Sequence, residues 1–332
     1  METKLVRIAE ISATSKHPIF TSVYHLINED MLKQCHKELD GNKAVGIDKV
    51  TKDEYGKNLD RNIKELVQRL KNKSFKPLPS LRVYIPKGNG KKRPLGIASY
   101  EDKIVQMAVK KILGAIYEPR FLNCMYGFRP NRGCHEAIKE VYQRISYGKI
   151  SYIVDADIKG FFDHIDHDWM MKFLEWNIQD KNLLWLIRKY LKAGIMEQGK
   201  FEPTEEGSAQ GSVMSPMLAN IYMHHVLTLW FKLVVQREMQ GECFLVNFAD
   251  DFAAVFVKFR KNPTKEQLIK ALVEFKGLPQ ELELPSAPKQ FIQYLEEDNR
   301  PQVTEDVNFE HGMGVSVGRL REDTVYDWKF VG

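Results

Sequence analysis

Two short stretches decide the fold of this chain: SYIVDADI at residues 151–158 and FLVNFADDFAAVFVKF at residues 244–259. In the first, Tyr, Val, Ala and Ile occupy the even positions, while Asp155 and Asp157 stand at odd positions. This period of two predicts a strand with carboxylates on one face. The second stretch has two strand-like runs around Ala249-Asp250-Asp251. It predicts a tight β-hairpin with an acidic tip.

Helical spacing of apolar residues marks other parts of the chain. Residues 101–117 and 183–191 follow the helical period, which predicts two core helices. Ser215-Pro216 offers an N-cap residue and a first-turn proline before an apolar run to Phe231. Polar residues interrupt the apolar stretch 213–235, so it predicts a buried helix rather than a membrane span. Helices mixed with strands predict an α+β layer fold.

The residues after 260 give weaker signals. Thr264 and Gln267 are spaced as a capping box, which predicts a helix there. Residues 314–320 and 325–331 read as strands.

Composition excludes several classes of protein. The 332 residues are 43% hydrophobic and 28% charged, which is typical of globular proteins and not of disordered or collagen-like chains. Four scattered cysteines without C-x-x-C spacing indicate neither a disulfide framework nor a zinc cluster. The first residues lack the apolar segment of a signal peptide, so we expect a cytoplasmic location and no membrane partner.

The net charge of +5 is unevenly distributed. Residues 51–150 contain 22 basic and 9 acidic residues, a net charge of +13. Residues 151–252 contain 9 basic and 15 acidic residues, a net charge of −6. A basic segment before an acidic one suits a protein that binds a polyanion and gathers carboxylates nearby. Solvated helix faces explain the same charges equally well.

Three carboxylates are candidates for a metal site. If the strands lie side by side, Asp157, Asp250 and Asp251 converge on one sheet edge, where they repel one another unless a divalent cation binds. Mg²⁺ prefers such oxygen ligands and leaves room for phosphate oxygens, which is the two-metal arrangement of nucleotidyl transfer. Taken alone, an Asp-Asp turn is more often a plain polar hairpin tip.

Two loops complete an ordered set of motifs. KGNGKKRP at 87–94 is a basic loop able to close on phosphates, although alone it reads better as a solvated turn. Residues 207–212 form a glycine-containing loop that enters the helix at Ser215.

In this order the motifs resemble the reverse transcriptase domain of group II intron-encoded proteins, from about residue 40 to 252. The matching segments are KAVGIDKVT (43–51), IPKGNGKKRPLGI (85–97), YEPRFLNCMYGFRPNRGCHEAI (117–138), DADIKGFFDHIDH (155–167), GSAQGSVMSPMLANIY (207–222) and FADD (248–251). The resemblance implies an α+β fold with the fingers and palm of a right-handed polymerase that copies RNA into DNA.

The resemblance also implies roles for single residues. Asp157, Asp250 and Asp251 become the catalytic Mg²⁺ carboxylates, Asp250 being favoured over Asp251 as a direct ligand. The nucleotide-binding residues become Lys87 and Arg93 on the triphosphate, Phe162 as the steric gate against a ribose 2′-hydroxyl, and Gln210 and Gly211 beside the template and nascent pair. A core aromatic is the alternative for Phe162. We interpret His164, His167, His224 and His225 as packing or surface residues.

Departures from the family pattern are mild before residue 252 and large after it. Phe248 stands where tyrosine is usual, and Ala209 where many members have proline. No primer grip or helical thumb is recognisable afterwards. Residues 253–332 instead resemble the C-terminal part of aspartate-semialdehyde dehydrogenase, through AAVFVKF (253–259), FKGLPQELELPSAPKQFIQYLEEDNRPQ (275–302) and GMGVSVGRLREDTVYDWKFVG (312–332). That family's dinucleotide turn and cysteine nucleophile lie upstream and are absent here, so we expect no NADP binding.

The sequence therefore predicts three parts: an N-terminal extension and fingers (1–150), a palm (151–252) and a dehydrogenase-like α/β fragment (253–332) in place of the thumb. We expect an RNA-directed DNA polymerase with Mg²⁺, dNTPs, an RNA template with a DNA primer, and intron RNA as partners. The alternative is a maturase-like protein that binds RNA without polymerising. A dehydrogenase remnant is a remote third.

Overall fold

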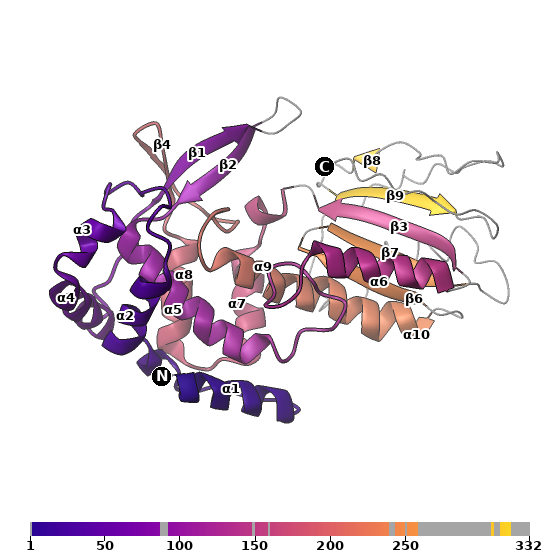
Figure 1. Ribbon diagram of the computed structural model, residues 1–332, viewed down its shortest axis with the longest axis horizontal. Coiled ribbons are helices and arrows are strands. Elements are labelled where there is room, and N and C mark those ends of the chain that lie inside the picture. The colour runs from indigo at the N-terminus through magenta and orange to yellow at the C-terminus, as the bar shows by residue number, and fades with distance from the viewer. Residues whose placement is uncertain are drawn as a thin grey trace. The chain divides into compact units, whose positions relative to one another are not determined.

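The computed structural model describes residues 2–86, 92–147, 150–158, 160–238, 243–249, 251–257, 307–308 and 313–319. The chain forms two compact units (Figure 1). Unit 1 consists of residues 1–121 and 161–222, and unit 2 of residues 122–160 and 223–332. The three-part division expected from the sequence stays a prediction.

The helices of unit 1 are built around α5 (Tyr100–Tyr117), the helix predicted over 101–117. Its apolar residues at helical spacing, from Ile104 to Ile116, are fully buried. Helices α1 (Glu2–Thr14) and α2 (Glu29–Glu38) pack against it (Figure 1). Further helices of the unit are α3 (Lys52–Gly56), α4 (Leu59–Lys71), α7 (His167–Glu175) and α8 (Lys181–Leu191), with short 3-10 turns η1 (Tyr24–Leu26) and η2 (Phe161–Asp163). The helix predicted over 183–191 is α8, so both core-helix predictions are confirmed.

Buried carboxylates fix the starts of these two helices. Asp102 follows the N-cap Ser99 and accepts hydrogen bonds from Ser99 Oγ at 2.5 Å, Leu78 N at 3.1 Å and Tyr190 Oη at 3.2 Å. Asp180 caps α8 and also accepts from the backbone N–H groups of Val23 and Tyr24, both at 2.7 Å. Each carboxylate thus joins segments that are far apart in sequence.

A small sheet in unit 1 carries the basic loop. Its strand order is β2-β1-β4-β5, formed by β1 (Ser80–Pro86), β2 (Lys92–Ile97), β4 (Ile195–Glu197) and β5 (Lys200–Glu202). Strands β1 and β2 pair antiparallel from Leu81 opposite Ile97 to Pro86 opposite Lys92. The basic residues 87–91, which connect these two strands in the sequence, lie outside the described residues.

Unit 2 is a five-stranded sheet in the order β6-β7-β3-β9-β8. Its strands are β3 (Ile150–Ile158), β6 (Cys243–Phe248), β7 (Asp251–Val257), β8 (Val307–Asn308) and β9 (Met313–Arg319). The strand predicted over 151–158 and the hairpin predicted around 249–251 are both confirmed. Helix α6 (Cys134–Tyr147) lies along the sheet (Figure 1), with the Arg144 guanidinium 5.0 Å from the Phe244 ring centroid.

The described part of the C-terminal segment belongs to this sheet. Strand β7 pairs antiparallel with one edge of β3, and β9 pairs antiparallel with the other. Strand β9 confirms the strand predicted over 314–320. The segments predicted over 264–267 and 325–331 lie outside the described residues. The replacement of a thumb by this segment stays a prediction.

The apolar run after Ser215 departs from a plain α-helix. It begins as α9 (Ser215–Met223), widens into π-helical turns η3 (His224–Thr228) and η4 (Phe231–Val235), and ends as α10 (Gln236–Glu238). In η3, Thr228 Oγ1 donates to His224 O at 3.0 Å and lies 3.2 Å from His224 Nδ1. Among the described residues, Ser215–Val235 is long and apolar enough to cross a membrane, and 61% of it is buried within the protein, as in a core helix.

Candidate active site

The backbone of unit 2 aligns two of the three predicted carboxylate positions. Asp157 of β3 stands opposite Asp251 of β7 in the antiparallel register. Asp251 is in turn opposite Phe248 of β6. Asp250 lies outside the described residues. The register thus places Asp157 and Asp251 at the same end of neighbouring strands, as the sequence prediction requires, and their role as ligands stays a prediction.

The donor set suits a hard divalent cation. Like charges at directly opposite positions of an antiparallel pair destabilise it, and a cation between carboxylates removes that repulsion. Among the described residues no three His, Cys, Asp or Glu side chains form a metal-binding group, and the predicted trio includes Asp250, which is outside them. Carboxylates alone favour Mg²⁺ over softer metals.

The turn between β6 and β7 is held in an unusual conformation. Ala249 has a φ of 60°, in the left-handed region that costs a residue with a Cβ about 1 kcal/mol. A two-residue hairpin turn requires such a φ at its first central position. Asn247 Nδ2 donates to Ala249 O at 2.8 Å, and both residues are buried. The acidic tip is therefore braced from within the hairpin.

A second brace comes from the segment before α6. Met125 forms a parallel bridge with Asn247: Asn247 N donates to Cys124 O and Tyr126 N donates to Asn247 O, both at 2.8 Å. A Cβ on Gly127 would collide with the backbone nitrogen of Ala249 and lie 3.0 Å from its Cα. Only glycine allows this approach, so Gly127 fixes the distance between the two segments.

The described nucleotide-binding candidates lie in unit 1. Arg93 is exposed on β2, opposite Ile85, and Lys87 lies outside the described residues. Gln210 accepts a hydrogen bond through its backbone oxygen from Gly96 N at 2.6 Å. Gly211 has a φ of +105°, and a Cβ there would be 3.0 Å from Gly96 O. The structure thus joins the 207–212 loop to the base of the β1–β2 hairpin.

Several buried groups hold this loop in place. Gln106 of α5 accepts through Oε1 from Ser212 Oγ and Val213 N, both at 3.0 Å. Ser215 Oγ donates to Ala209 O at 3.0 Å. His167 is buried, and its Nε2 lies 2.6 Å from Gly207 O. Because a carbonyl oxygen can only accept, Nε2 is the ring nitrogen that carries the proton in this hydrogen bond. The prediction of His167 as a packing residue is confirmed, and its contact makes it a support for the loop.

Phe162 is buried beside the same loop. Its side chain is 9% exposed and packs edge-on against Phe161 at a centroid distance of 5.6 Å. Its backbone oxygen accepts from Ser208 N at 2.7 Å. Burial agrees with the core-aromatic alternative, and contact with the loop agrees with a gate.

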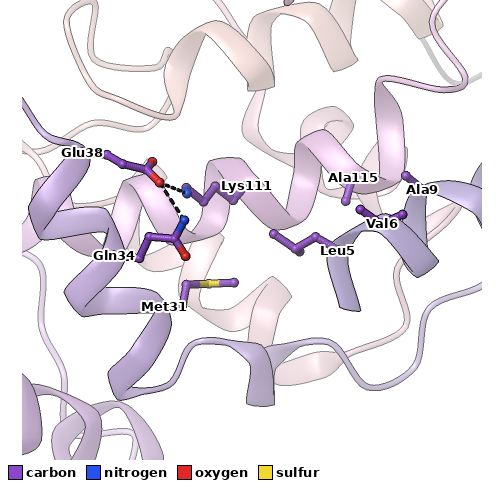
Figure 2. Close-up of a pocket in the computed structure, with 8 residues that line it drawn as sticks. All are labelled: Leu5, Val6, Ala9, Met31, Gln34, Glu38, Lys111 and Ala115. Atoms are coloured by element: carbon purple, nitrogen blue, oxygen red, sulfur yellow. Dashed lines mark hydrogen bonds and ion pairs between the residues drawn. The ribbon is translucent and has the colours of Figure 1, made fainter. Parts of the chain in front are cut away.

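A cavity of about 380 Å³ lies elsewhere in unit 1, between α1, α2 and α5 (Figure 2). Leu5, Val6, Ala9, Met31 and Ala115 give it apolar walls. At one end Glu38 Oε1 accepts from Lys111 Nζ at 2.6 Å and Gln34 Nε2 at 2.9 Å. None of the predicted site residues lines it.

Comparison with known proteins gives a family match. Residues 85–288, more than half of the chain, match the family described as reverse transcriptase (RNA-dependent DNA polymerase). The chain belongs to the reverse transcriptase family. The match contains Asp157, the loop at 207–212 and the acidic hairpin, and it continues 36 residues beyond 252, where the sequence resemblance was expected to stop.

Individual relatives include proteins encoded in introns. The group II intron-encoded protein LtrA of Lactococcus lactis subsp. cremoris is 38% identical over 238 residues, which is 70% of this chain and 39% of LtrA. An uncharacterized 91 kDa protein in the cob intron of Schizosaccharomyces pombe is 37% identical over 204 residues, 60% of this chain and 25% of that protein. The chain thus spans about two fifths of LtrA and a quarter of the yeast protein.

A further relative belongs to another family. Aspartate-semialdehyde dehydrogenase of Schizosaccharomyces pombe is 44% identical over 80 residues, 23% of this chain and 22% of the dehydrogenase. The match is about as long as residues 253–332, the segment for which the sequence predicts this resemblance.

Sequence reasoning missed the residues that brace the site. Gln106 is a buried polar residue among the apolar residues between Ile104 and Ile116 of α5, which was a usable signal. Gly127 lies inside a quoted motif, but its close approach to Ala249 depends on tertiary contact. Asn247 lies within a strand-like run, and the residue pattern of that run does not indicate that Asn247 supports the turn.

Proposed function

We propose that this protein is an RNA-directed DNA polymerase of the group II intron type. The observation that carries the proposal is the register of Asp157 opposite Asp251, within a chain of the reverse transcriptase family. The reaction is in-line attack of the primer 3′-oxygen on the α-phosphorus of a dNTP. The bond from that phosphorus to the oxygen bridging to the β-phosphate breaks, pyrophosphate leaves, and the 3′-hydroxyl proton passes to solvent.

Asp157, Asp250 and Asp251 would hold Mg²⁺ in this reaction. The bound ions would supply charge neutralisation at the 3′-oxygen and the triphosphate. The protein's own contribution is a rigid hairpin: Asn247 and Gly127 fix the turn that carries two of the carboxylates. Positioning of this kind accounts for much of the rate of phosphoryl transfer.

The residues of unit 1 would bind the incoming nucleotide. Arg93 is exposed and always charged, so it suits bidentate binding of phosphate oxygens, with Lys87 as a second cation. Gln210 and Gly211 belong to a loop held by backbone contacts to β2, which suits packing against a base pair. Phe162 would exclude a ribose 2′-hydroxyl.

Primer extension on poly(rA)/oligo(dT) with Mg²⁺ tests this proposal. The wild-type chain is expected to extend the primer, and Asp157→Ala is expected to lose extension while keeping its affinity for the primed template. Extension that survives Asp157→Ala would disprove the site assignment.

A second candidate function is RNA binding without polymerisation. The concentration of basic residues in 51–150, with a net charge of +13, favours it, since phosphate contacts alone supply salt-dependent affinity. Intron RNA would then be the partner. Affinity that falls with salt, together with no extension by the wild-type chain, would select this function.

The dehydrogenase-like segment suggests a composite origin for the chain. Identity of 44% over 80 residues supports a fragment of that family joined after about residue 252. We expect no NADP binding by this fragment, which isothermal titration with NADP tests. Sequencing across codons 245–260 from independent source DNA would show an intact reverse transcriptase gene, a dehydrogenase gene, or the junction itself.

A further inference from the structure

We propose that Phe128 is a stacking platform for a nucleobase of the primed template beside the acidic hairpin. The proposal rests on the polymerase or RNA-binding function above, and it adds a binding residue that neither the metal site nor the nucleotide-binding candidates include. It uses residues of unit 2 alone.

Phe128 directly follows the glycine that abuts the hairpin turn. Gly127 approaches Ala249 so closely that no other residue fits there, and Ala249 precedes the two acidic residues of the turn. Phe128 is the next residue after Gly127, so the contact of Gly127 with Ala249 also fixes the backbone position of Phe128 relative to the turn. Nucleic acid bound at the acidic hairpin would therefore lie near the segment that carries Phe128.

The conformation of Phe128 is costly and leaves its ring accessible. Its φ is 58°, a left-handed value that bulky residues rarely adopt. Asn131, three residues later, is also left-handed, with a φ of 57°. The residue is 47% exposed, so the strain is not offset by full burial. Strained backbone conformations are concentrated at functional sites.

Two arginines keep the strained segment rigid. Arg129 Nη1 donates to Leu122 O at 3.0 Å and Met125 O at 3.1 Å. Arg132 donates to Asn123 O at 2.7 Å and to Asn123 Oδ1 at 3.0 Å, and its guanidinium lies 5.3 Å from the Tyr126 ring centroid. The loop is thus built to hold one conformation rather than to move.

The segment that carries Phe128 has a net positive charge. Residues 122–149 contain five basic residues and two acidic ones. A basic segment attracts the phosphate backbone, and an exposed aromatic ring stacks on any base, since every base has a π-face. This combination favours single-stranded or frayed nucleic acid over a protein partner.

The test measures binding of a fluorescent poly(rA)/oligo(dT) primed template to the full chain by anisotropy. Phe128→Ala is expected to weaken the affinity by about 5- to 150-fold, the range of one lost base stack, and to raise the KM for primed template with kcat retained. Phe128→Trp is expected to restore the affinity. Tyr142→Ala, which removes another exposed aromatic side chain of unit 2, is the matched control and should bind as the wild type does.

Phe128→Gly separates stacking from backbone strain. Glycine relieves the left-handed φ, so this variant should unfold at a temperature no lower than that of the wild type, yet bind as weakly as Phe128→Ala. Wild-type affinity in Phe128→Ala or Phe128→Gly, or failure of Phe128→Trp to restore binding, would overturn the proposal. A wild-type chain that binds the primed template without extending it would refute the polymerase function and leave the stacking proposal intact. A wild-type chain with no affinity for nucleic acid would overturn both.

Discussion

Replacement of Asp102 by asparagine should remove part of the pH dependence of the stability of unit 1. Asp102 is 2% exposed, and burial raises the pKa of its carboxyl from 3.8 to about 6, against the opposing effect of its hydrogen bonds. The pKa is higher in the folded state than in the unfolded state, so folding favours the protonated form. The resulting stabilisation is complete below pH 3.8 and is lost as the pH rises through about 6.

The size of the effect follows from the shift in pKa. A rise from 3.8 to about 6, at about 1.36 kcal/mol per unit, corresponds to about 3 kcal/mol lost between these pH values. Asparagine keeps an acceptor oxygen for Leu78 N and Ser99 Oγ, and its amide can donate to Tyr190 Oη. Asp102→Asn therefore removes the cost of burying a charge without emptying the site.

Hydrogen exchange of peptides from α5 measures the local free energy of opening in unit 1. Between pH 4 and 7, the difference between Asp102→Asn and the wild type should move by about 3 kcal/mol in favour of the variant. Ser74→Ala, at an exposed position, provides a baseline. Parallel pH profiles for the variant and the wild type would refute the reasoning about this carboxylate.

Three further substitutions test the supports of the site. Gln106→Leu leaves Ser212 Oγ and Val213 N without their acceptor, which should cost about 1–3 kcal/mol of stability. Peptides over 207–215 should then exchange faster, and the KM for dNTP should rise. Gln106→Glu is the control, because it should keep both hydrogen bonds. Phe162→Val should lower the melting temperature and raise incorporation of rNTP relative to dNTP; an unchanged ratio would leave Phe162 a core residue only. Asp180→Ala removes the acceptor of four backbone N–H groups and should lower the free energy of unfolding, measured in urea, by about 2 kcal/mol or more. A loss smaller than that expected for one missing N-cap would contradict the role of Asp180 in joining the two segments.

The parts of the fold that depend on local pattern were predictable from the sequence. Strand β3, the β6–β7 hairpin, α5 and α8 follow from periods of two and 3.6 residues that neighbouring residues impose. The π-helical turns at 224–235 were not predictable, because they depend on packing and not on apolar spacing. The pairing of β9 with β3 joins residues about 160 positions apart, and no local pattern specifies such a partner.

Some features of the candidate site were also predictable from the sequence, and others were not. The acidic residues stood out because an aspartate in a β-rich run is unusual, and the ordered motifs carried their roles by resemblance. The register of Asp157 with Asp251, the contact of Gly127 with Ala249 and the left-handed φ of Phe128 arise only when distant segments meet. Gln106 shows the intermediate case, since its polarity was visible but its partners in the 207–213 loop were not.

The measurement that tests the central claim most directly is primer extension by Asp157→Asn beside Asp155→Asn. Both residues lie on β3, but Asp155 stands opposite Ala253 and Asp157 opposite Asp251. With Mg²⁺, poly(rA)/oligo(dT) and dTTP, the wild type and Asp155→Asn should extend the primer, and Asp157→Asn should not. Equal extension by both variants, or loss of extension in Asp155→Asn alone, would contradict the assignment of Asp157 to the catalytic metal site.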